Sequence, residues 1–138
     1  MNFNYSIIIP FRDNIDLLQT AVNSIPDRTD IQIIIVDNSK ESLESFFVNN
    51  HKNACLKYLT SSATKGAGHA RNVGLEQAEG KWLLFLDADD YFTKSAFEYF
   101  DEYLNTEFYL VCFNITSCML ETVARINSHV PYGIKLQQ

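Results

Sequence analysis

The sequence has none of the features that mark a membrane-spanning or secreted chain. Its 138 residues contain no apolar run close to the ~20 residues that a membrane-spanning helix needs. Residues 1–5 do not combine a basic region with a following apolar stretch, so we expect no signal peptide. Internal repeats, linkers and low-complexity tracts are also absent. With 46% apolar residues, the chain is expected to form one globular domain over residues 1–138.

Positive charge and paired cysteines are scarce as well. The net charge of −6 argues against a nucleic-acid-binding protein, which needs a basic surface. It does not argue against a nucleotide, because a local cation and a metal ion can neutralise a diphosphate. The three cysteines, Cys55, Cys112 and Cys118, form no C-x-x-C pair, so neither a zinc site nor a redox pair is indicated. We expect reduced, mostly buried thiols and a cytoplasmic protein.

Continuous apolar runs alternate with segments of helical spacing in the first 113 residues. The run Ile7-Ile8-Ile9 is typical of a strand that is buried on both faces, as in a parallel sheet. Strands are expected at residues 5–10, 31–36, 56–59, 82–86 and 108–113, and helices at about residues 14–25, 43–48, 69–78 and 93–104. This order predicts the α/β class, with a mainly parallel, Rossmann-like sheet flanked by helices.

Polar groups follow three of the expected strands at the point where each strand ends. They are Arg12-Asp13 after the first strand, Asp37-Asn38 after the second, and Asp87-Ala88-Asp89-Asp90 after the fourth. Ligands of open α/β sheets bind beyond the carboxyl ends of the strands. Solubility alone would not require acids at each of these points, so together they predict a binding site.

The acidic segment at residues 87–90 suits a hard divalent cation. Alternate carboxylates of a short segment can point to one region, and their oxygens are ligands that Mg²⁺ and Mn²⁺ prefer. Such an ion keeps positions open for phosphate oxygens and neutralises charge on a departing diphosphate. The alternative is a solvated acidic turn in which Asp90 favours the start of the next helix.

Two further segments carry groups suited to a nucleotide. Asp37 can accept hydrogen bonds from a base or a ribose, or it can cap the next helix together with Ser39. The segment from Lys65 to Asn72 joins two glycines and cationic side chains to a helix start, where anions are favoured. It matches neither G-x-G-x-x-G nor the P-loop. We expect its Arg71 to face a diphosphate; the alternative is a flexible surface loop before an ordinary helix.

Four segments, taken in order, resemble family 2 glycosyltransferases of the GT-A fold. They are Tyr5-Ser-Ile-Ile-Ile-Pro-Phe-Arg-Asp-Asn14, Ile33-Ile-Ile-Val-Asp-Asn-Ser39, Gly66-Ala-Gly-His-Ala-Arg-Asn-Val-Gly74 and Leu84-Phe-Leu-Asp-Ala-Asp-Asp90. The last one resembles the metal-binding D-x-D segment of that family. The resemblance covers about residues 5–113 and implies the nucleotide-sugar-binding half of a GT-A domain.

The resemblance implies a nucleotide-binding role for five matched positions. Pro10 and Phe11 would border the base, and Asp37 would contact it, the base being commonly uracil in this family. Arg71 would lie near the nucleotide and its phosphates, and Asp87 near the ribose.

The resemblance also implies a cofactor and a reaction. Asp89 would bind the Mn²⁺ or Mg²⁺ that bridges the diphosphate. A sugar would be transferred from a nucleotide-diphospho-sugar, UDP-linked in this interpretation, to a hydroxyl of a glycan or another acceptor, with inversion at the anomeric carbon. Such a polysaccharide-building enzyme is expected in the cytoplasm or at the inner face of the membrane, reached only through segments outside this chain.

Three departures from the usual family pattern bear on this function. Asn38-Ser39 replaces the usual Asp-Gly, and Phe11-Arg12 replaces the usual aromatic-Asn pair. Family members also continue beyond this length, and their second half carries the acceptor site and a carboxylate general base. Residues 114–138 hold one acid, Glu121, in no recognised motif, so the catalytic residue is unknown.

Other functions remain open at this point. A catalytically incomplete nucleotide-sugar-binding or interaction module is the main alternative, and a truncated sheet with exposed apolar surface would favour self-association. A phosphatase of the haloacid-dehalogenase type also has Asp-x-Asp after a strand, but there it follows the first strand and here the fourth. A nucleotidyltransferase would show a glycine-rich, basic first loop, which Phe11-Arg12-Asp13 is not.

Overall fold

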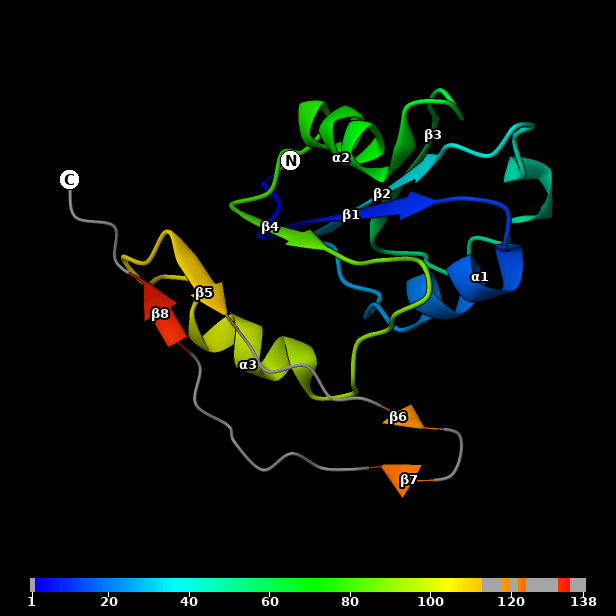
Figure 1. The fold of residues 1–138 in the computed structure, drawn as a ribbon. Coiled ribbons are helices and arrows are strands. Elements are labelled where there is room, and N and C mark those ends of the chain that lie inside the picture. Colours follow the sequence, from blue (N-terminus) through cyan, green and yellow to red (C-terminus); the bar gives the residue numbers. More distant parts are fainter. Residues whose placement is uncertain (1, 113–117, 120–121, 124–131, 135–138) are drawn as a thin grey trace. The chain divides into compact units, whose positions relative to one another are not determined.

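The computed structural model describes residues 2–112, 118–119, 122–123 and 132–134, and the chain divides into two compact units, Met1–Phe97 and Glu98–Gln138. The first unit holds a four-stranded parallel sheet in the order β3-β2-β1-β4. The strands are β1 (Tyr5–Phe11), β2 (Ile31–Asp37), β3 (Cys55–Thr60) and β4 (Trp82–Phe85). The helices of this unit are α1 (Ile15–Asn23), the 3-10 turn η1 (Glu44–Phe46) and α2 (Gly66–Glu76) (Figure 1). The predicted α/β class with a parallel sheet is confirmed.

The two central strands are buried over their whole length. All seven residues of β1 and all seven of β2 are buried, as expected of apolar runs in a sheet covered on both faces. The chain moves outward from β1 to β2 and β3, and then returns to the other side of β1 to form β4. This reversal places the topological switch point between β1 and β4, where ligands of such sheets bind.

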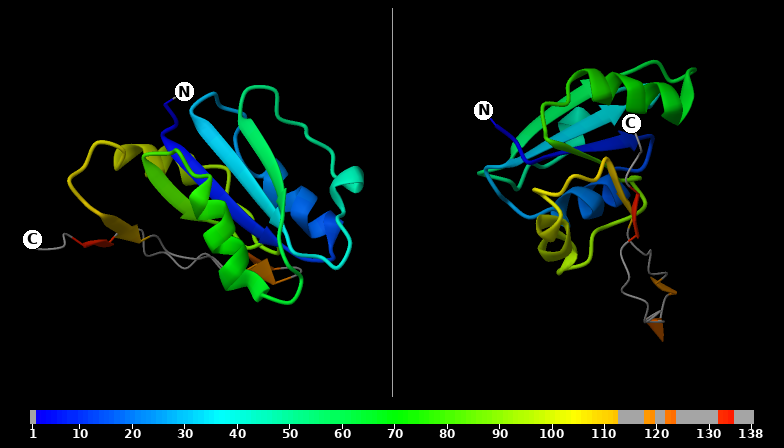
Figure 2. Two further views of the ribbon diagram at one scale, coloured as in Figure 1. Left: turned by 90° about the horizontal axis from the view of Figure 1, so that it is seen from above. Right: turned by 90° about the vertical axis from the view of Figure 1, so that its left-hand side faces the viewer.

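Alternate residues of the central strands face different helices. Ile8, Ile34 and Val36 pack in one cluster with Ala70 of α2, so the even-numbered positions of β1 and β2 lie on the face that α2 covers. The odd-numbered positions lie on the opposite face, which α1 covers (Figures 1 and 2). Helix α2 approaches the sheet closely because Gly74 has no side chain: a Cβ there would lie 2.5 Å from Cγ2 of Ile8.

Helix α1 follows the predicted pattern. The side-chain oxygen of Asn14 accepts a hydrogen bond of 3.2 Å from the N–H of Leu17, which makes Asn14 the N-cap of a helix expected to begin near this residue. The buried side of the helix consists of Leu18, Ala21 and Val22. The helix ends at Asn23, a little before the expected end near residue 25, and Pro26 follows shortly after it.

A buried polar group ties the amino ends of the strands to the end of α2. The Ser6 hydroxyl donates to the Gln32 side-chain oxygen over 2.6 Å, and it accepts a hydrogen bond of 2.7 Å from the N–H of Gly80. The Gln32 amide donates to the carbonyl of Gln77, the residue that caps the C-terminus of α2. Because the C-terminus of α2 lies at the amino ends of the strands, its N-terminus lies at their carboxyl ends.

Three elements differ from the sequence-based expectation. The helix expected at residues 43–48 is a single 3-10 turn, Glu44–Phe46, whose N-cap, Leu43, makes no side-chain capping hydrogen bond. Helix α2 begins at Gly66, earlier than the expected residue 69. Helix α3 is shorter than predicted and spans Ala96–Glu102, across the division between the two units.

In the second unit, two short antiparallel pairs are described. Strand β5 (Leu110–Cys112) pairs with β8 (Tyr132–Ile134), and β6 (Cys118–Met119) pairs with β7 (Thr122–Val123). The strand predicted at residues 108–113 is therefore present in part, but it pairs with a later strand instead of extending the parallel sheet. The single domain over residues 1–138 stays a prediction.

Two other expectations concern the membrane and the cysteines. Within the described part of the chain, no helix is both long enough and apolar enough to cross a membrane. Cys55 is a free cysteine, but it is half-buried where a buried side chain was expected. The side chains of Cys112 and Cys118 lie outside the described residues, and so does Glu121.

Candidate functional site

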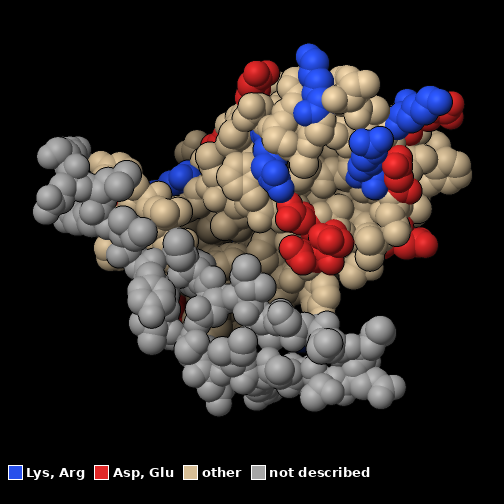
Figure 3. Space-filling view, in the orientation of Figure 1, with Lys and Arg blue, Asp and Glu red and all other residues tan. Residues whose placement is uncertain are grey.

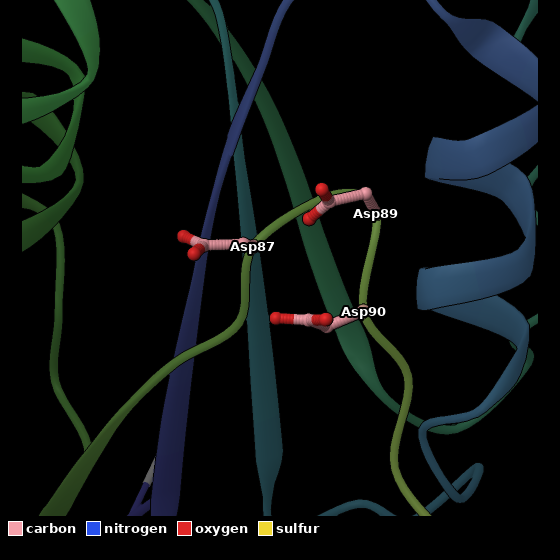
Figure 4. Close-up of side chains that lie close together, drawn as sticks. All are labelled: Asp87, Asp89 and Asp90. Atoms are coloured by element: carbon pink, nitrogen blue, oxygen red, sulfur yellow. The ribbon is translucent and has the colours of Figure 1, made fainter. Parts of the chain in front are cut away.

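The acidic segment that follows β4 folds into a tight turn. The N–H of Leu86 donates a hydrogen bond of 3.0 Å to the carbonyl of Ile8, which anchors the start of the segment on β1. The N–H of Asp90 donates a hydrogen bond of 2.9 Å to the carbonyl of Asp87 and closes the turn. As a result, carboxylate oxygens of Asp87, Asp89 and Asp90 all lie within 4.8 Å of one another (Figure 4).

The three carboxylates of this turn fit a divalent cation. Their side chains are exposed, and acidic side chains gather on this face of the molecule beside basic ones (Figure 3). Partial burial raises the pKa of Asp90 above its usual value, and the charges of Asp89 and Asp87 raise it further. A bound cation would relieve this repulsion, and exposed oxygens leave room for phosphate at the same ion. Asp90 adds a third carboxylate to those of Asp87 and Asp89, although it was expected only to favour the start of the next helix.

Arg71 reaches the acidic turn from α2. Its Nη2 atom donates a hydrogen bond of 2.7 Å to Oδ1 of Asp87. Arg71 directly follows Ala70, which is buried against the sheet, so the packing of α2 fixes the point from which the guanidinium extends. The two side chains are 36% and 52% exposed, and an exposed ion pair of this kind adds little to stability. Both charges remain accessible to a ligand.

The N-terminus of α2 lies at the same edge of the sheet and is open. Its N-cap residue, Lys65, makes no side-chain capping hydrogen bond. Gly66 has a φ of +77°, which favours glycine, and a Cβ there would meet nothing within 4 Å. The uncapped N–H groups of a helix start attract anions. The segment from Lys65 to Asn72 therefore brings a helix start and Arg71 to the edge where the acidic turn lies.

Asp37 lies inside the protein, and its carboxylate is fully engaged. Only 1% of the residue is exposed. Its Oδ1 accepts a hydrogen bond of 2.9 Å from the N–H of Ser39, and its Oδ2 accepts from the N–H of Leu43 (2.8 Å) and the hydroxyl of Tyr58 (2.6 Å). Burial acts to raise the pKa of Asp37, but the hydrogen bonds outweigh it and hold the pKa below its usual value. The helix cap considered for Asp37 and Ser39 is not formed, because the segment that follows is a 3-10 turn whose N-cap, Leu43, has no side-chain capping hydrogen bond. A base contact by Asp37 stays a prediction.

The last residues of β1 are buried and hold the loop that follows. Pro10 and Phe11 are both buried, and the carbonyl of Phe11 accepts a hydrogen bond of 2.9 Å from the N–H of Asn38. Asp13 has a φ of 64°, which is unusual for a non-glycine residue, and its N–H donates a hydrogen bond of 2.8 Å to the hydroxyl of Ser39. The loop after β1 is thus fixed by the end of β2.

Five of the six predicted site residues fall into two groups, and the sixth, Pro10, is an even-numbered residue of β1. The structure brings Arg71, Asp87 and Asp89 together at the N-terminal half of α2. Phe11 and Asp37 occupy odd-numbered strand positions, on the face of the sheet that α1 covers. Asn38 was named among the polar groups at the strand ends but received no role of its own, although the alternation of the strand predicts that it lies on the α2 face. Its signal is the strand period itself, applied one residue beyond the end of β2.

A comparison with protein families shows the family of the chain. The family model described as Glycosyl transferase family 2 matches residues 6–137. The chain belongs to glycosyl transferase family 2. The matched range includes the carboxyl ends of β1 and β2, the start of α2 and the acidic turn after β4.

Several curated members of the family are similar to the chain. Poly(ribitol-phosphate) β-N-acetylglucosaminyltransferase TarS of Staphylococcus aureus is 29% identical over 96 residues, which cover 65% of the chain and 17% of TarS. The minor teichoic acid biosynthesis protein GgaB of Bacillus subtilis is 30% identical over 115 residues, or 75% of the chain and 13% of GgaB. The Escherichia coli β-1,3-glucosyltransferase WfaP, named for UDP-Glc and α-D-GlcNAc-diphosphoundecaprenol, is 32% identical over 104 residues, or 74% of the chain and 41% of WfaP.

Solved structures show the same fold. Residues 1–349 of TarS in complex with UDP-GlcNAc give a TM-score of 0.59 at 27% identity, covering 75% of the chain and 31% of the TarS chain. The mannosyltransferase PcManGT of Pyrobaculum calidifontis, in complex with GDP-Man and Mn²⁺, gives a TM-score of 0.71 and covers 83% of the chain and 36% of its own. At 17% identity, the second likeness concerns the fold alone.

The comparisons confirm the family and the fold that the sequence analysis expected. The relatives TarS and WfaP are named as transferases, so the predicted enzyme class is confirmed at the level of the family. The chain spans between 13% and 41% of the length of the three relatives above. The activity of the whole protein, its substrates and its partners are therefore matters for proposal.

Proposed function

We propose that this chain binds the nucleotide-diphospho-sugar donor of an inverting glycosyltransferase, and that the donor is UDP-linked. The donor lies at the carboxyl ends of β1, β2 and β4, at the switch point of the sheet. The observation that carries the proposal is the meeting of Arg71 with Asp87 and Asp89 at that point, beside the open N-terminus of α2.

The charged groups of the site have two separate tasks. Some contact the diphosphate, and others hold its counter-ion. The uncapped N–H groups at the start of α2 and the guanidinium of Arg71 attract the phosphate oxygens. Asp89, with Asp90 beside it, would hold Mn²⁺ or Mg²⁺, and Asp87 would also lie near the ribose. When bound, the cation supplies Lewis-acid neutralisation of the charge on the departing diphosphate.

The framework of the base region comes from the ends of β1 and β2. Pro10 and Phe11 border this region as buried parts of the sheet, and Asp37 fixes the turn after β2 through its three internal donors. A uridine donor is supported by two relatives: TarS, which is solved in complex with UDP-GlcNAc, and WfaP, which is named for UDP-Glc.

The transfer step needs a general base, and no residue of this chain is assigned to it. A hydroxyl acceptor must lose its proton as it attacks, so an inverting transferase uses a general base. We assign no residue of this chain to that role. The acceptor in this proposal is a hydroxyl of a glycan, and the protein works in the cytoplasm or at the inner face of the membrane.

A second function is favoured by the share of the relatives that the chain spans. It covers 31% of the TarS chain solved with UDP-GlcNAc. A piece of this size with a donor site and no assigned base would act as a nucleotide-sugar-binding module, alone or within a larger protein.

One experiment tests the function and separates the two forms of it. The protein is titrated with UDP and with GDP in the presence of Mn²⁺, and UDP release from UDP-GlcNAc and UDP-Glc is then followed. We expect UDP to bind more tightly than GDP. Release of UDP above the rate without protein supports the transferase, and binding without release supports the module. Binding of neither nucleotide contradicts the proposed function.

A further inference from the structure

The two ends of the acidic turn are held by different elements. At its start, the N–H of Leu86 is bonded to the carbonyl of Ile8 in β1. Just after its end, the N–H of Phe92 donates a hydrogen bond of 3.0 Å to Oγ of Ser24, the residue that caps the C-terminus of α1. Ser24 and Phe92 are 68 positions apart in sequence. The segment after β4 therefore runs from the sheet to α1 and is bonded at both ends (Figure 1).

The Ser24 hydroxyl is oriented by the helix to which it belongs. Its hydrogen is donated to the carbonyl of Ala21 over 2.6 Å, and Ala21 is fully buried. The N–H of Ser24 also bonds back to the helix, to the carbonyls of Thr20 and Ala21. Because the hydroxyl hydrogen is used by Ala21, the oxygen lone pairs are left to accept from Phe92. Ser24 thus joins the core-facing side of α1 to the segment that carries the acids.

Phe92 is also held by its ring, which packs in an aromatic cluster. The ring centroid of Phe92 lies 5.2 Å from that of Phe97, and Phe97 lies 5.5 Å from Tyr5, both in edge-to-face geometry. The guanidinium of Arg28 lies 5.8 Å from the Tyr5 ring and 5.9 Å from the Phe97 ring. The cluster fixes the side chain of Phe92, and the Ser24 hydroxyl fixes the direction of its peptide N–H. Loss of the hydroxyl should therefore loosen the backbone next to the acids without unfolding the sheet.

The acidic turn needs support from outside because its charges repel one another. Carboxylate oxygens of Asp87, Asp89 and Asp90 within 4.8 Å of one another favour opening of the turn before a cation binds. Inside the turn, the hydrogen bond from the N–H of Asp90 to the carbonyl of Asp87 opposes this repulsion. Ligands that are held at their spacing in advance bind an ion more tightly, because less order has to be created on binding.

We propose that Ser24 is a positioning residue for the cation site of the donor. Its hydroxyl holds the N–H of Phe92 and so keeps Asp89 and Asp90 at the spacing that suits Mn²⁺ or Mg²⁺. The inference rests on the proposed function and adds to it a residue of α1 that is distant in sequence. Ser24 acts through the backbone of Phe92 and is not itself a ligand. Helix α2 supplies groups that face the diphosphate, and the end of α1 fixes the acids that hold its counter-ion.

The test compares serine hydroxyls that make the same kinds of bond at different places. Ser24→Ala removes the hydroxyl, Ser24→Cys keeps a similar shape with a weaker acceptor, and Ser24→Thr keeps the hydroxyl. Ser6→Ala is the matched control. The Ser6 hydroxyl also donates one hydrogen bond and accepts from backbone N–H groups, but it does so at the amino ends of the strands. UDP is titrated into each protein at a series of Mn²⁺ concentrations, and the melting temperature without ligand is recorded.

The quantity to compare is the Mn²⁺ concentration that gives half-maximal UDP binding. We expect it to rise about five- to tenfold in Ser24→Ala, the effect of losing roughly one hydrogen bond that orders the ligands. Ser24→Cys should show a rise in the same direction, and Ser24→Thr should stay within about twofold of wild type. Ser6→Ala should melt at a lower temperature and keep the wild-type Mn²⁺ requirement.

Different results overturn different statements. If wild-type protein shows Mn²⁺-dependent UDP binding and both Ser24→Ala and Ser24→Cys have the wild-type Mn²⁺ requirement, the role of Ser24 is wrong and the proposed function stands. An equal rise in Ser6→Ala, or no recovery in Ser24→Thr, also contradicts the role of the hydroxyl. Should Ser24→Ala fail to fold, the comparison of Ser24→Cys with Ser24→Thr decides. If wild-type protein binds no UDP at any Mn²⁺ concentration, the proposed function fails and the inference with it.

Discussion

The hydroxyl of Tyr58 in β3 lies 2.6 Å from the carboxylate of Asp37 at the end of β2 and donates a hydrogen bond to it. The two residues are 21 positions apart in sequence and meet because β2 and β3 pair in register, with Ile35 opposite Tyr58. Burial raises the pKa of Tyr58 well above its usual value, and the charge of Asp37 raises it further. The hydroxyl therefore keeps its proton at neutral pH and remains a donor.

Replacing Tyr58 by Phe should lower the free energy of unfolding by about 2 kcal/mol, because a buried carboxylate loses one of its three donors. Urea unfolding measures the loss. In a double-mutant cycle with Asp37→Asn, the two effects should be clearly less than additive, since both remove the same bond. Full additivity would show that the pair does not interact in solution.

The close contact between α2 and β1 gives a second prediction. A Cβ on Gly74 would lie 2.5 Å from Ile8, whereas one on Gly68 would meet nothing within 4 Å. Gly74→Ala should therefore destabilise the fold by about 1–3 kcal/mol through overpacking. Gly68→Ala should stabilise it by up to about 1 kcal/mol through helix propensity. Thermal unfolding of the two variants provides the comparison, and equal shifts would contradict the packing described.

Arg71 should matter for binding and not for stability. Arg71→Gln removes a half-exposed ion pair with Asp87, so the free energy of unfolding should change by less than about 1 kcal/mol. The affinity for UDP should fall about tenfold or more, because a charge-assisted contact to phosphate is lost. Lys57→Gln is a matched control, since Lys57 is also 36% exposed and pairs with Glu79, a residue that follows α2. Equal UDP affinities in the two variants would show that Arg71 does not contact the nucleotide.

The acid sensitivity of the fold should depend on Asp27. Its carboxylate accepts hydrogen bonds from the backbone N–H groups of Ala54, Lys52 and Asn53, which lower its pKa to about 2. Since the folded pKa lies below the unfolded value of 3.8, the contribution to stability is present above about pH 4 and is lost as the pH falls towards 2.

Asp27→Asn should consequently melt at a lower temperature than wild type at pH 6, and the difference should shrink between pH 4 and pH 2.5. The pKa values of Asp30 and Asp37 are also lowered, so the variant keeps part of the acid sensitivity. Parallel melting curves over this range would mean that the three N–H groups do not bind Asp27 in solution.

The elements that the sequence predicts well are those whose signal is local. The apolar runs of β1 and β2 and the helix start near residue 14 each have a signal that lies within a few residues, and the structure places them as expected. Strand β5 was assigned to the wrong sheet, because its partner at residues 132–134 lies far along the chain. Pairing between distant segments leaves little trace in either segment alone.

In the site as well, features within one short segment could be predicted from the sequence, and features that depend on contacts between distant segments could not. The acidic turn is one short segment, so its grouping of carboxylates was foreseeable, although the bond from Asp90 to Asp87 that adds a third acid was not. The engagement of Asp37 depends on Tyr58, which only the register of β2 and β3 brings near. The alternation of the strand does distinguish Asp37 from Asn38, and that signal was present in the sequence but unused.

The central claim is that the acidic turn after β4 holds the cation of a nucleotide donor. Calorimetric titration of UDP with and without Mn²⁺ tests it on wild type, on Asp89→Ala and on Asp16→Ala, an exposed acid in the first turn of α1 that serves as the control. We expect UDP binding that requires Mn²⁺, persists in Asp16→Ala and is lost in Asp89→Ala. UDP binding that is equally tight without Mn²⁺, or unchanged in Asp89→Ala, would contradict the account.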